Sequence, residues 1–285
     1  MKKKKKSNFI TIFLVLILLA GLSLLLYPTF SDYWNSFHQS RAIASYSDAV
    51  EELDEEDYEA FWQAAVEYNK EMASTGNRFS LSEEEEEEYN KILDITGTGI
   101  MGYVEIPSIQ CSLPIYHGTD EAVLQIAAGH IEGTSLPVGG ESSHCVISGH
   151  RGLPSAKLFT DLDQLVEGDV FMLRVMDEVL TYEVDQILIV EPYDLDALQI
   201  EDGKDYCTLV TCTPYGVNTH RLLVRGHRIE NIEDSDSAYV TADAIQIEPL
   251  IVAPIVAVPM LLILLIIVLL PKRRKGKGGK SHEKR

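Results

Sequence analysis

Residues 208–228 read TLVTCTPYGVNTHRLLVRGHR, and this stretch decides the fold. Its first part alternates apolar residues with threonine up to Cys212, a pattern typical of a half-buried strand. Pro214 and Gly216 then predict a turn, and RLLVRGHR predicts a second strand. A hairpin of this form places Arg221 across the ladder from Cys212. The stretch therefore predicts a thiol beside a guanidinium at one end of a hairpin.

A thiol in this position suggests nucleophilic chemistry. Cysteine attacks as a thiolate, which a free thiol forms only to a few per cent near neutral pH, so it needs a cationic or proton-accepting partner. Among the eight histidines, His150 is the best placed, because CVISGHRGLP predicts a strand that ends just before it in a Gly/Pro loop. A guanidinium is always charged, so Arg221 can favour a thiolate or stabilise an oxyanion. We interpret Cys212 as nucleophile, His150 as proton carrier and Arg221 as charge stabiliser.

The surrounding sequence, from Ile100 onward, predicts short strands separated by turns. Seven or so strands without regular strand–helix alternation indicate an antiparallel-rich barrel or sandwich. The predicted strands are GYVEI, CSLPIY, HCVIS, DVFMLRV, VLTYEVDQILIVE, YCTLVT and HRLLVRGHRIE. Short helices are predicted at EAVLQIAAG, LFTDLDQL and DLDALQI.

The region before these strands predicts helices. Residues 31–74 carry apolar residues at helical spacing, such as Phe61, Ala65, Tyr68 and Met72. The six consecutive glutamates that begin at Glu83 predict a solvated helix start.

Two uncharged apolar segments predict membrane helices. Residues 9–27 and 249–270 are each long enough to cross roughly 30 Å of hydrocarbon as a helix. Both carry Lys and Arg on their terminal side, which places the two ends in the cytoplasm and residues 28–248 outside. The first segment exceeds the ~7–15 apolar residues of a signal peptide, so we expect an uncleaved anchor.

Charge and cysteine content narrow the function classes. The net charge is −20, although the two ends hold 13 of the 24 Lys and Arg residues, so the middle is strongly acidic and unsuited to nucleic acid. The four cysteines are too irregularly spaced for a zinc site or a disulfide framework. We expect Cys111, Cys145 and Cys207 to be small buried residues, with a Cys145–Cys207 bridge left open.

Three blocks of this sequence together resemble the sortase family of Gram-positive bacteria, and most closely its pilus-assembling class C branch. The blocks are TLVTCTPYGVNTHRLLVRGHR, SGHRGLPSAKLFTDLDQL and MGYVEIPSIQCSLPIYHGT. The resemblance runs from about Asn77 to Ile229. It implies a mostly β fold, a closed eight-stranded sortase-type barrel with short helices, preceded by N-terminal helices and flanked by two transmembrane helices.

The resemblance also implies an activity, a transpeptidase that acts on Leu-Pro-x-Thr-Gly sorting signals. Cys212 then forms a thioester with the substrate threonine, His150 protonates the leaving amine and activates the incoming one, and Arg221 steadies the substrate and its oxyanion. In class C the incoming amine is a pilin lysine, so the partners are pilin or surface proteins and the membrane. No metal or organic cofactor is implied.

Hydropathy and the resemblance together predict the domain organisation. The catalytic barrel is expected at residues 97–232, behind an extracellular helical region at 28–76 and a lid segment at 77–96. The remaining parts are the cytoplasmic basic tail 1–8, the transmembrane helix 9–27, the linker 233–248, the transmembrane helix 249–270 and the cytoplasmic basic tail 271–285.

The lid and the substrate groove are the least defined parts. Class C sortases tend to carry an Asp-Pro-aromatic motif that plugs the cleft, whereas residues 78–82 read RFSLS. Phe79 could still supply the aromatic plug without the acidic partner. Candidate groove residues are Thr211, Thr213 and Leu209, although leucines on such strands more often belong to the core.

Four other functions are weighed against this interpretation. A papain-type protease would place cysteine before histidine, yet chain order alone does not decide. A sorted surface adhesin would need Leu-Pro-x-Thr-Gly just before the apolar run, and VTADAIQIEP stands there instead. A housekeeping sortase that attaches proteins to a cell-wall precursor and a non-catalytic pilin-binding protein stay as alternatives.

Overall fold

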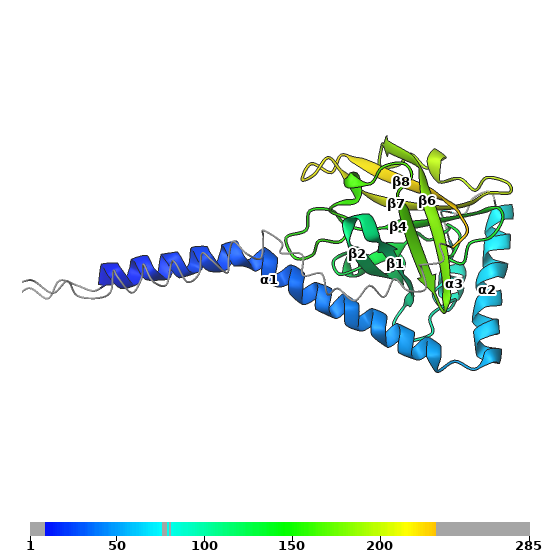
Figure 1. Ribbon diagram of the computed structural model, residues 1–285, viewed down its shortest axis with the longest axis horizontal. Helices are drawn as coiled ribbons and strands as arrows, with labels where there is room; N and C mark the ends of the chain where they lie inside the picture. The colour runs from blue at the N-terminus through cyan, green and yellow to red at the C-terminus, as the bar shows by residue number, and fades with distance from the viewer. Residues whose placement is uncertain (1–8, 76–78, 80, 232–285) are drawn as a thin grey trace, which may run out of the picture. The chain divides into compact units, whose positions relative to one another are not determined.

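The computed structural model describes residues 9–75, 79 and 81–231, and within them the strands close into one barrel (Figure 1). Hydrogen-bonded neighbours follow the order β1-β2-β3-β4-β7-β8-β6-β5. This confirms the predicted mostly β, closed eight-stranded barrel. The strands are β1 (Ile100–Ile106), β2 (Cys111–His117), β3 (Ala128–His130), β4 (Ser143–Ser148), β5 (Val170–Val175), β6 (Glu178–Val190), β7 (Asp205–Thr213) and β8 (His220–Arg228).

Most strand pairs are antiparallel, as the sequence predicted. The exceptions among the described strands are β2 with β3 and β4 with β7, which run parallel. The seven predicted strands are all present, but β3 was not predicted. Its first two residues are the last two of EAVLQIAAG, which the sequence assigned to a helix, and only Glu121–Leu124 forms the helix α4. A three-residue strand is too short to show a period of two, so local pattern cannot reveal it.

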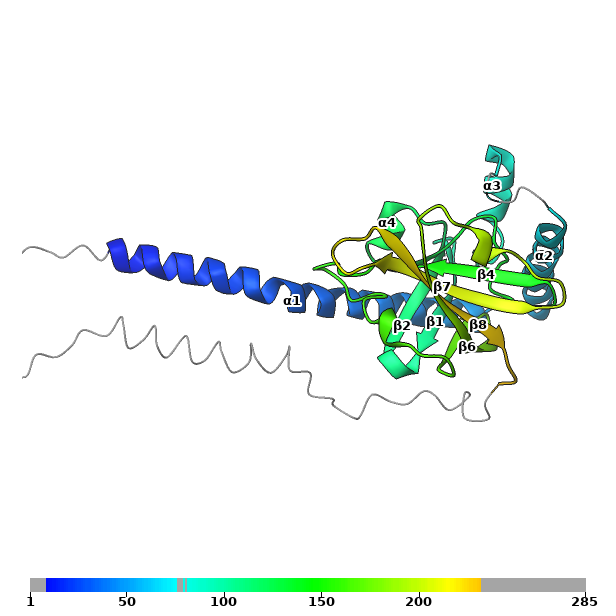
Figure 2. The same cartoon turned by 90° about the horizontal axis from the view of Figure 1, so that it is seen from above.

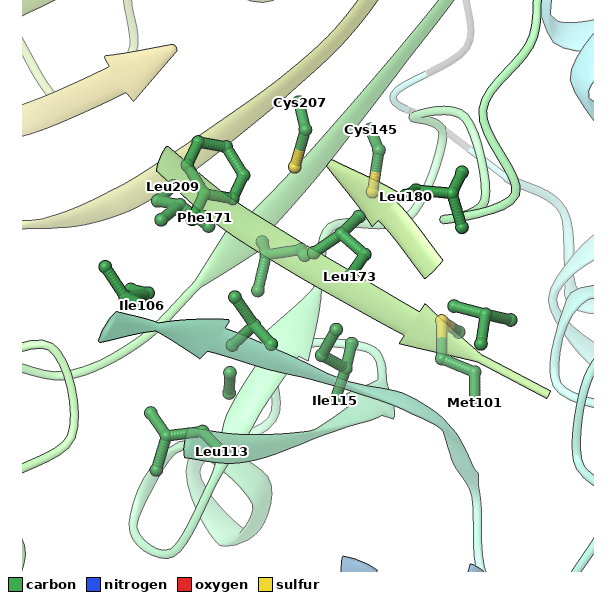
Figure 3. Close-up of a cluster of buried hydrophobic side chains, with 14 of the residues drawn as sticks. Met101, Ile106, Leu113, Ile115, Cys145, Phe171, Leu173, Leu180, Cys207 and Leu209 are labelled. Carbon is green, nitrogen blue, oxygen red and sulfur yellow. The ribbon is translucent and has the colours of Figure 1, made fainter. Parts of the chain in front are cut away.

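Side chains that alternate along each strand fill the barrel interior. On β7, Cys207 and Leu209 join the main apolar core, whereas Val210 belongs to a separate cluster. Figure 3 shows Cys145 and Cys207 side by side among the core leucines. The two cysteines are register partners on β4 and β7.

Short 3₁₀ helices occupy the longer connections between strands. The predicted helices LFTDLDQL and DLDALQI appear as η2 (Leu162–Gln164) and η3 (Asp196–Leu198), and η1 (Pro107–Ile109) joins β1 to β2. Each is shorter than its predicted segment. An amphipathic pattern predicts that a helical turn is present more reliably than it predicts the length of the turn, because the ends of an element depend on local hydrogen bonding.

The helix α2 (Glu55–Ser74) lies against the barrel in both views (Figures 1 and 2). Asp54 caps its N-terminus by accepting a hydrogen bond from the amide of Asp57. The buried Asn69 side chain then binds both the amide and the carbonyl of Leu136 in the barrel, at 2.6 and 3.1 Å. These paired bonds fix α2 to the loop between β3 and β4.

The glutamate run forms the helix α3 (Glu83–Tyr89), as predicted. Ser82 and Glu85 form a reciprocal capping box at its start, which explains why the helix begins there. The helix ends on Tyr89, which is fully buried and hydrogen-bonded through its hydroxyl to His130 Nδ1 at 2.9 Å. The glutamates therefore remain in solvent while the last residue anchors the helix.

The first helix, α1, runs without interruption from Phe9 to Glu51. The sequence predicts a membrane helix at 9–27 and an extracellular helical region from 28, and the backbone runs through both parts as one helix. Pro28 lies inside the helix, where a proline removes one backbone hydrogen bond without always ending the helix. Of the described helices, α1 is the one whose length and apolar composition would allow it to cross a membrane.

The chain divides into two compact units, and α1 contributes to both. The described residues from Phe30 onward make up one unit, which contains the barrel, and those up to Thr29 belong to the other. The predicted helix 249–270, the linker 233–248 and the basic tails 1–8 and 271–285 lie outside the described residues.

Candidate active site

Cys212 lies near the end of β7, directly across the ladder from Arg221 at the start of β8. The predicted hairpin and its register are therefore confirmed. Cys212 and Arg221 are each partly exposed, while Thr211, which precedes Cys212 on β7, is buried. The thiol and the guanidinium thus belong to opposite residues at the rim of the barrel, where a substrate can reach them.

His150 follows β4, and the parallel pairing of β4 with β7 brings it to the same rim. The last paired residues of β4 and β7 are Ser148 and Val210. His150 and Cys212 each follow two residues later in the chain. The pairing continues past the end of β4, because the amide of Gly149 donates to Val210 O at 3.0 Å. Thr211 Oγ1 also donates to Gly149 O at 2.7 Å. Cys212, His150 and Arg221 consequently come from three adjacent strands that end together.

Gly149 is required by the close packing beneath His150. A Cβ atom at this position would lie 2.6 Å from the ring of Phe159, which is fully buried. The amide of Phe159 in turn donates to His150 O at 3.1 Å. The histidine is therefore held on a tightly packed backbone, although it lies outside regular secondary structure.

Charged and polar groups surround the three residues. Glu121 on α4 places its carboxylate 3.8 Å from His150 Nε2, and the Glu121 side chain is largely exposed. Arg221 Nη1 donates to His220 O at 3.1 Å and to Asn218 O at 3.4 Å. These bonds to the turn hold the guanidinium near the β7–β8 connection.

An apolar patch lies on the outer side of the barrel next to Cys212. We call it the outer patch, and its buried members are Val146, Leu198, Val210 and Leu223. Val210 precedes Cys212 by two residues and so points to the same side of β7. Phe79 packs against this patch. The patch offers an apolar surface beside the thiol, and Phe79 now contacts it.

The other candidate groove residues lie elsewhere. Leu209 is fully buried in the main core, so its side chain packs the interior and does not face a substrate. Thr211 is also buried and binds Gly149, which gives it a role in joining β7 to the residue before His150. Thr213 is largely buried, with its hydroxyl 3.5 Å from Arg151. Phe79, in contrast, packs against the outer patch.

Sequence reasoning missed Arg151, which follows His150 directly. Its Nη2 pairs with Asp163, and its guanidinium lies over the ring of Tyr215, 5.7 Å from the centroid. The signal was present in the block SGHRGLP, where a second charged residue stands beside the histidine. Nothing in that pattern tells which partners the arginine meets.

The three remaining cysteines are free, and two of them, Cys145 and Cys207, are buried in the core. Burial raises the pKa of Cys111 to about 12 and the pKa of Cys207 well above its ordinary range. A thiol in such surroundings stays protonated and unreactive. Cys145 is also buried beside Cys207. Burial raises its pKa, but hydrogen bonds with Cys207 and His130 lower it to about 6. Its depth in the core keeps a substrate from it, so Cys212 is the cysteine placed for chemistry.

A concavity of about 510 Å³ lies at the other end of the hairpin. Its walls include Asp205 at the start of β7 and Arg228 at the end of β8. Seven residues separate Asp205 from Cys212, which is roughly 23 Å along a strand. This concavity is therefore separate from the candidate catalytic residues.

Comparison with known proteins identifies the relatives of this chain. A family model described as the sortase domain matches residues 104–229. Sortase C1 from Streptococcus agalactiae is 55% identical, with a TM-score of 0.66, and the match covers 67% of this chain and all of that structure. Sortase C from Streptococcus pneumoniae is 44% identical, with a TM-score of 0.60, and the match covers 67% and 97% of the two chains.

A curated relative matches over a shorter region. Sortase D of Bacillus subtilis is 31% identical over 131 residues, which make up 45% of this chain and 63% of the relative. The match to sortase D thus spans less than two thirds of that relative, whereas the match to the solved sortase C1 covers all of that chain. The barrel, the matched domain and the high identity to a whole solved chain lead to one conclusion: the chain belongs to the sortase family of cysteine transpeptidases.

Proposed function

We propose that this protein is a membrane-anchored transpeptidase that cleaves a Leu-Pro-x-Thr-Gly-type sorting signal between Thr and Gly and transfers the acyl group to an amine. The observation that carries the proposal is the register of β7 and β8, which sets Cys212 opposite Arg221 while β4 delivers His150 to the same rim. A nucleophile, a proton carrier and a fixed cation are the groups that acyl transfer requires.

In the first step the sulfur of Cys212 attacks the carbonyl carbon of the substrate threonine. The carbonyl oxygen gains negative charge, and the guanidinium of Arg221 stabilises it. The bond from that carbon to the glycine nitrogen then breaks, and His150 gives its proton to the departing amine. The product of this step is a thioester on Cys212 and a free glycine amine.

In the second step an incoming amine replaces the glycine. His150, now neutral, takes a proton from the amine as its nitrogen attacks the thioester carbon. The carbon–sulfur bond breaks, Cys212 leaves as a thiolate paired with the protonated His150, and an amide forms. Peptide-bond cleavage and amide formation balance, so the reaction needs no oxidant or cofactor.

The outer patch supplies a surface for the apolar part of the signal. Leucine and proline side chains of the substrate gain free energy when they leave water, at about 25 cal/mol per Å² of apolar surface. Val210 lies beside Cys212 on one side of β7, so a peptide bound there would present its threonine to the thiol. In this proposal Phe79 occupies the patch until substrate displaces it.

We further propose a pilin lysine as the acceptor amine. The solved relatives at 55% and 44% identity are both class C sortases, and the S. pneumoniae structure is described in terms of pilin substrate specificity. The acidic barrel region and Glu121 beside His150 would attract a cationic amine. Attachment of surface proteins to a cell-wall precursor is the alternative.

Localisation is part of the same proposal. The apolar first part of α1 anchors the chain in the membrane, a second helix at residues 249–270 crosses it again, and the barrel lies on the extracellular face. Basic residues at both ends of the chain support this orientation. A protease that reaches one side of sealed vesicles should cut the barrel only when the extracellular face is exposed.

The activity is tested with the full-length chain in detergent micelles. We expect a Leu-Pro-x-Thr-Gly peptide to leave an acyl adduct on Cys212, detected by mass spectrometry, that an added amine removes as an amide. Cys212→Ala should form no adduct, whereas Cys111→Ala serves as the matched control and should behave as wild type. An intact peptide and unmodified Cys212 after long incubation would refute the proposal.

The acceptor is tested by competition. A peptide with an internal lysine and a glycine peptide that resembles a cell-wall bridge are offered together to the acyl enzyme. Preferential amide formation at the lysine side chain supports pilus assembly, and preferential use of the glycine amine favours cell-wall attachment.

A further inference from the structure

Arg151 is the most deeply buried charged side chain near the candidate active site. Only 9% of its side chain is exposed, although it lies in the loop that follows β4. Arginine in a loop is ordinarily solvated, and its guanidinium cannot lose its charge in a protein. A buried position therefore requires partners that hold it in one orientation.

Three partners from separate segments meet this guanidinium. Nη2 forms an ion pair with Asp163 in η2, and Nη1 donates to Thr213 Oγ1 at 3.5 Å. The ring of Tyr215 lies under the guanidinium at 5.7 Å. We call these four residues the Arg151 cluster. One side chain thus connects the loop after β4, the η2 turn and the end of β7.

The partners of Arg151 lie next to the reacting residues. Arg151 follows His150, and Thr213 follows Cys212. The registered ladder between β4 and β7 ends at Ser148 and Val210, so the backbone beyond these residues depends on other contacts. Thr211 supplies one of them through its bond to Gly149. The Arg151 cluster supplies a second contact between the two segments, beyond His150 and Cys212 in the chain.

Tyr215 also packs directly on the loop that carries His150. Gly152 has a positive φ of +75°, and a Cβ atom there would lie 3.0 Å from the Tyr215 ring. The ring thus covers Gly152 and the guanidinium together. The β7–β8 turn and the loop after β4 therefore touch through Tyr215 as well as through Thr213.

Stability alone does not account for this arrangement. The Nε atom of Arg151 is buried without a hydrogen-bond partner among the described residues. A buried donor in that state costs free energy, and buried ion pairs are often no more stabilising than apolar side chains of the same shape. The planar guanidinium of Arg151 instead holds the segments that it bridges in a fixed relative position.

We propose that Arg151 is a positioning residue that fixes His150 relative to Cys212, with Asp163 setting the orientation of the guanidinium. It does not contact substrate, since its side chain is covered by Tyr215 and Thr213. Loss of the bridge lets the loop after β4 move and separates the proton carrier from the thiol. A misplacement of about 1 Å can reduce a rate about 100-fold. The inference rests on the proposed acyl transfer.

The test uses the full-length chain in micelles with Arg151→Met, Arg151→Lys and Asp163→Asn. The control is Lys157→Met, which breaks an ion pair with Asp161 in the same segment. Four quantities are measured: kcat and KM for peptide acylation, the rate of Cys212 alkylation near neutral pH, and the melting temperature. Alkylation reports the thiol and its histidine without any sorting signal.

Arg151→Met should lower kcat at least about tenfold and change KM less than about twofold, because only the positioning of His150 is lost. Cys212 alkylation should fall in parallel, and His150→Ala should lower it as well. Arg151→Lys should recover part of kcat, since a lysine can pair with Asp163 but cannot also reach Thr213. Asp163→Asn should add nothing to Arg151→Met, which shows that both act through one contact.

The proposal is overturned if Arg151→Met keeps wild-type kcat and alkylation, or loses both only in proportion to a lower folded fraction. Should that variant not fold, Tyr215→Leu decides, because Tyr215 is 60% exposed and its replacement leaves the ion pair intact. It should lower kcat and alkylation without a matching drop in melting temperature, and an unchanged kcat would overturn the proposal. Failure of the wild type to acylate would refute the proposed function, while the alkylation comparison would still decide the role of Arg151.

Discussion

The parallel pair β4 and β7 places cysteines and a histidine in two different environments. Near its start, Cys145 and Cys207 are register partners inside the barrel (Figure 3). His150 and Cys212 lie at the rim, five residues further along the chain in each case. Burial raises the pKa of Cys207 well above its ordinary range, whereas Cys212 is partly exposed beside Arg221.

This difference shows that environment and not residue type assigns the chemistry. Among apolar side chains the thiol of Cys207 does not ionise readily, because a thiolate loses its hydration there. At the rim, water can hydrate the thiolate of Cys212, and the guanidinium of Arg221 supplies a positive charge. The same two strands can therefore carry core residues at one point and reacting residues a few positions later.

The largest effect is expected in the reactivity of the four cysteines. Iodoacetamide should modify Cys212 in the folded chain and the two core cysteines at least about 1,000-fold more slowly, because these react only when the barrel opens at a cost of 5 kcal/mol or more. Peptide mapping by mass spectrometry gives the rate at each site. Comparable alkylation rates at Cys207 and Cys212 would contradict the difference between core and rim thiols.

The next effect concerns the guanidinium beside Cys212. Arg221→Lys should lower kcat about 100-fold, because an ammonium cannot reproduce the fixed donors that face the developing oxyanion. The matched control is Arg225→Lys on the same strand, where the side chain pairs with Asp185 at 2.9 Å. We expect this control to lose stability and keep kcat. Equal kcat losses in both variants would place Arg221 among the structural arginines.

A smaller effect tests whether Phe79 restricts access to the rim. Phe79 contacts the outer patch beside Cys212, so Phe79→Ala should raise the alkylation rate of Cys212 about fivefold, corresponding to about 1 kcal/mol of lost contact. Leu81→Ala, two residues away, is the control. An unchanged rate in Phe79→Ala would mean that Phe79 is no plug.

The smallest effect lies at the far end of β7. Burial raises the pKa of Asp205 above its usual value, so the folded state binds this proton more tightly than the unfolded state. Its contribution to stability is present below about pH 3.9 and is lost as the pH rises through the folded pKa. Asp205→Asn should therefore gain melting temperature relative to wild type as the pH rises through that window.

Catalytic rate separates this variant from those at the rim. Asp205→Asn should keep kcat, because its side chain lies far from Cys212 along the strand. A constant difference in melting temperature across the pH range would contradict the assigned pKa shift, and a loss of kcat would show that the two ends of β7 are coupled.

Local sequence pattern predicted most of the barrel. The alternation in β6 and β7 and the turn residues between β7 and β8 are local signals, and those elements formed where expected. The strand β3 was missed because three residues have no readable period. The unbroken course of α1 through Pro28 was also missed, since proline favours a helix boundary without requiring one.

The candidate site was predictable where it depends on neighbours in the chain. The pairing of Cys212 with Arg221 follows from one hairpin, so turn length and alternation suffice. His150 was assigned from its position at a strand exit and from resemblance. The outer patch was not predictable, because Leu198 and Val146 come from distant segments that pack together only in the closed barrel.

The sequence by itself determined the hairpin, the apolar segment of α1 and the three residues typical of a sortase, because each depends on short-range pattern. The tertiary structure alone decided which thiols are buried and which is exposed, and it brought Asp163 and Tyr215 to Arg151. Burial and long-range contact depend on how the barrel closes, since β4 and β7 are separated by about 60 residues in sequence and paired directly in space.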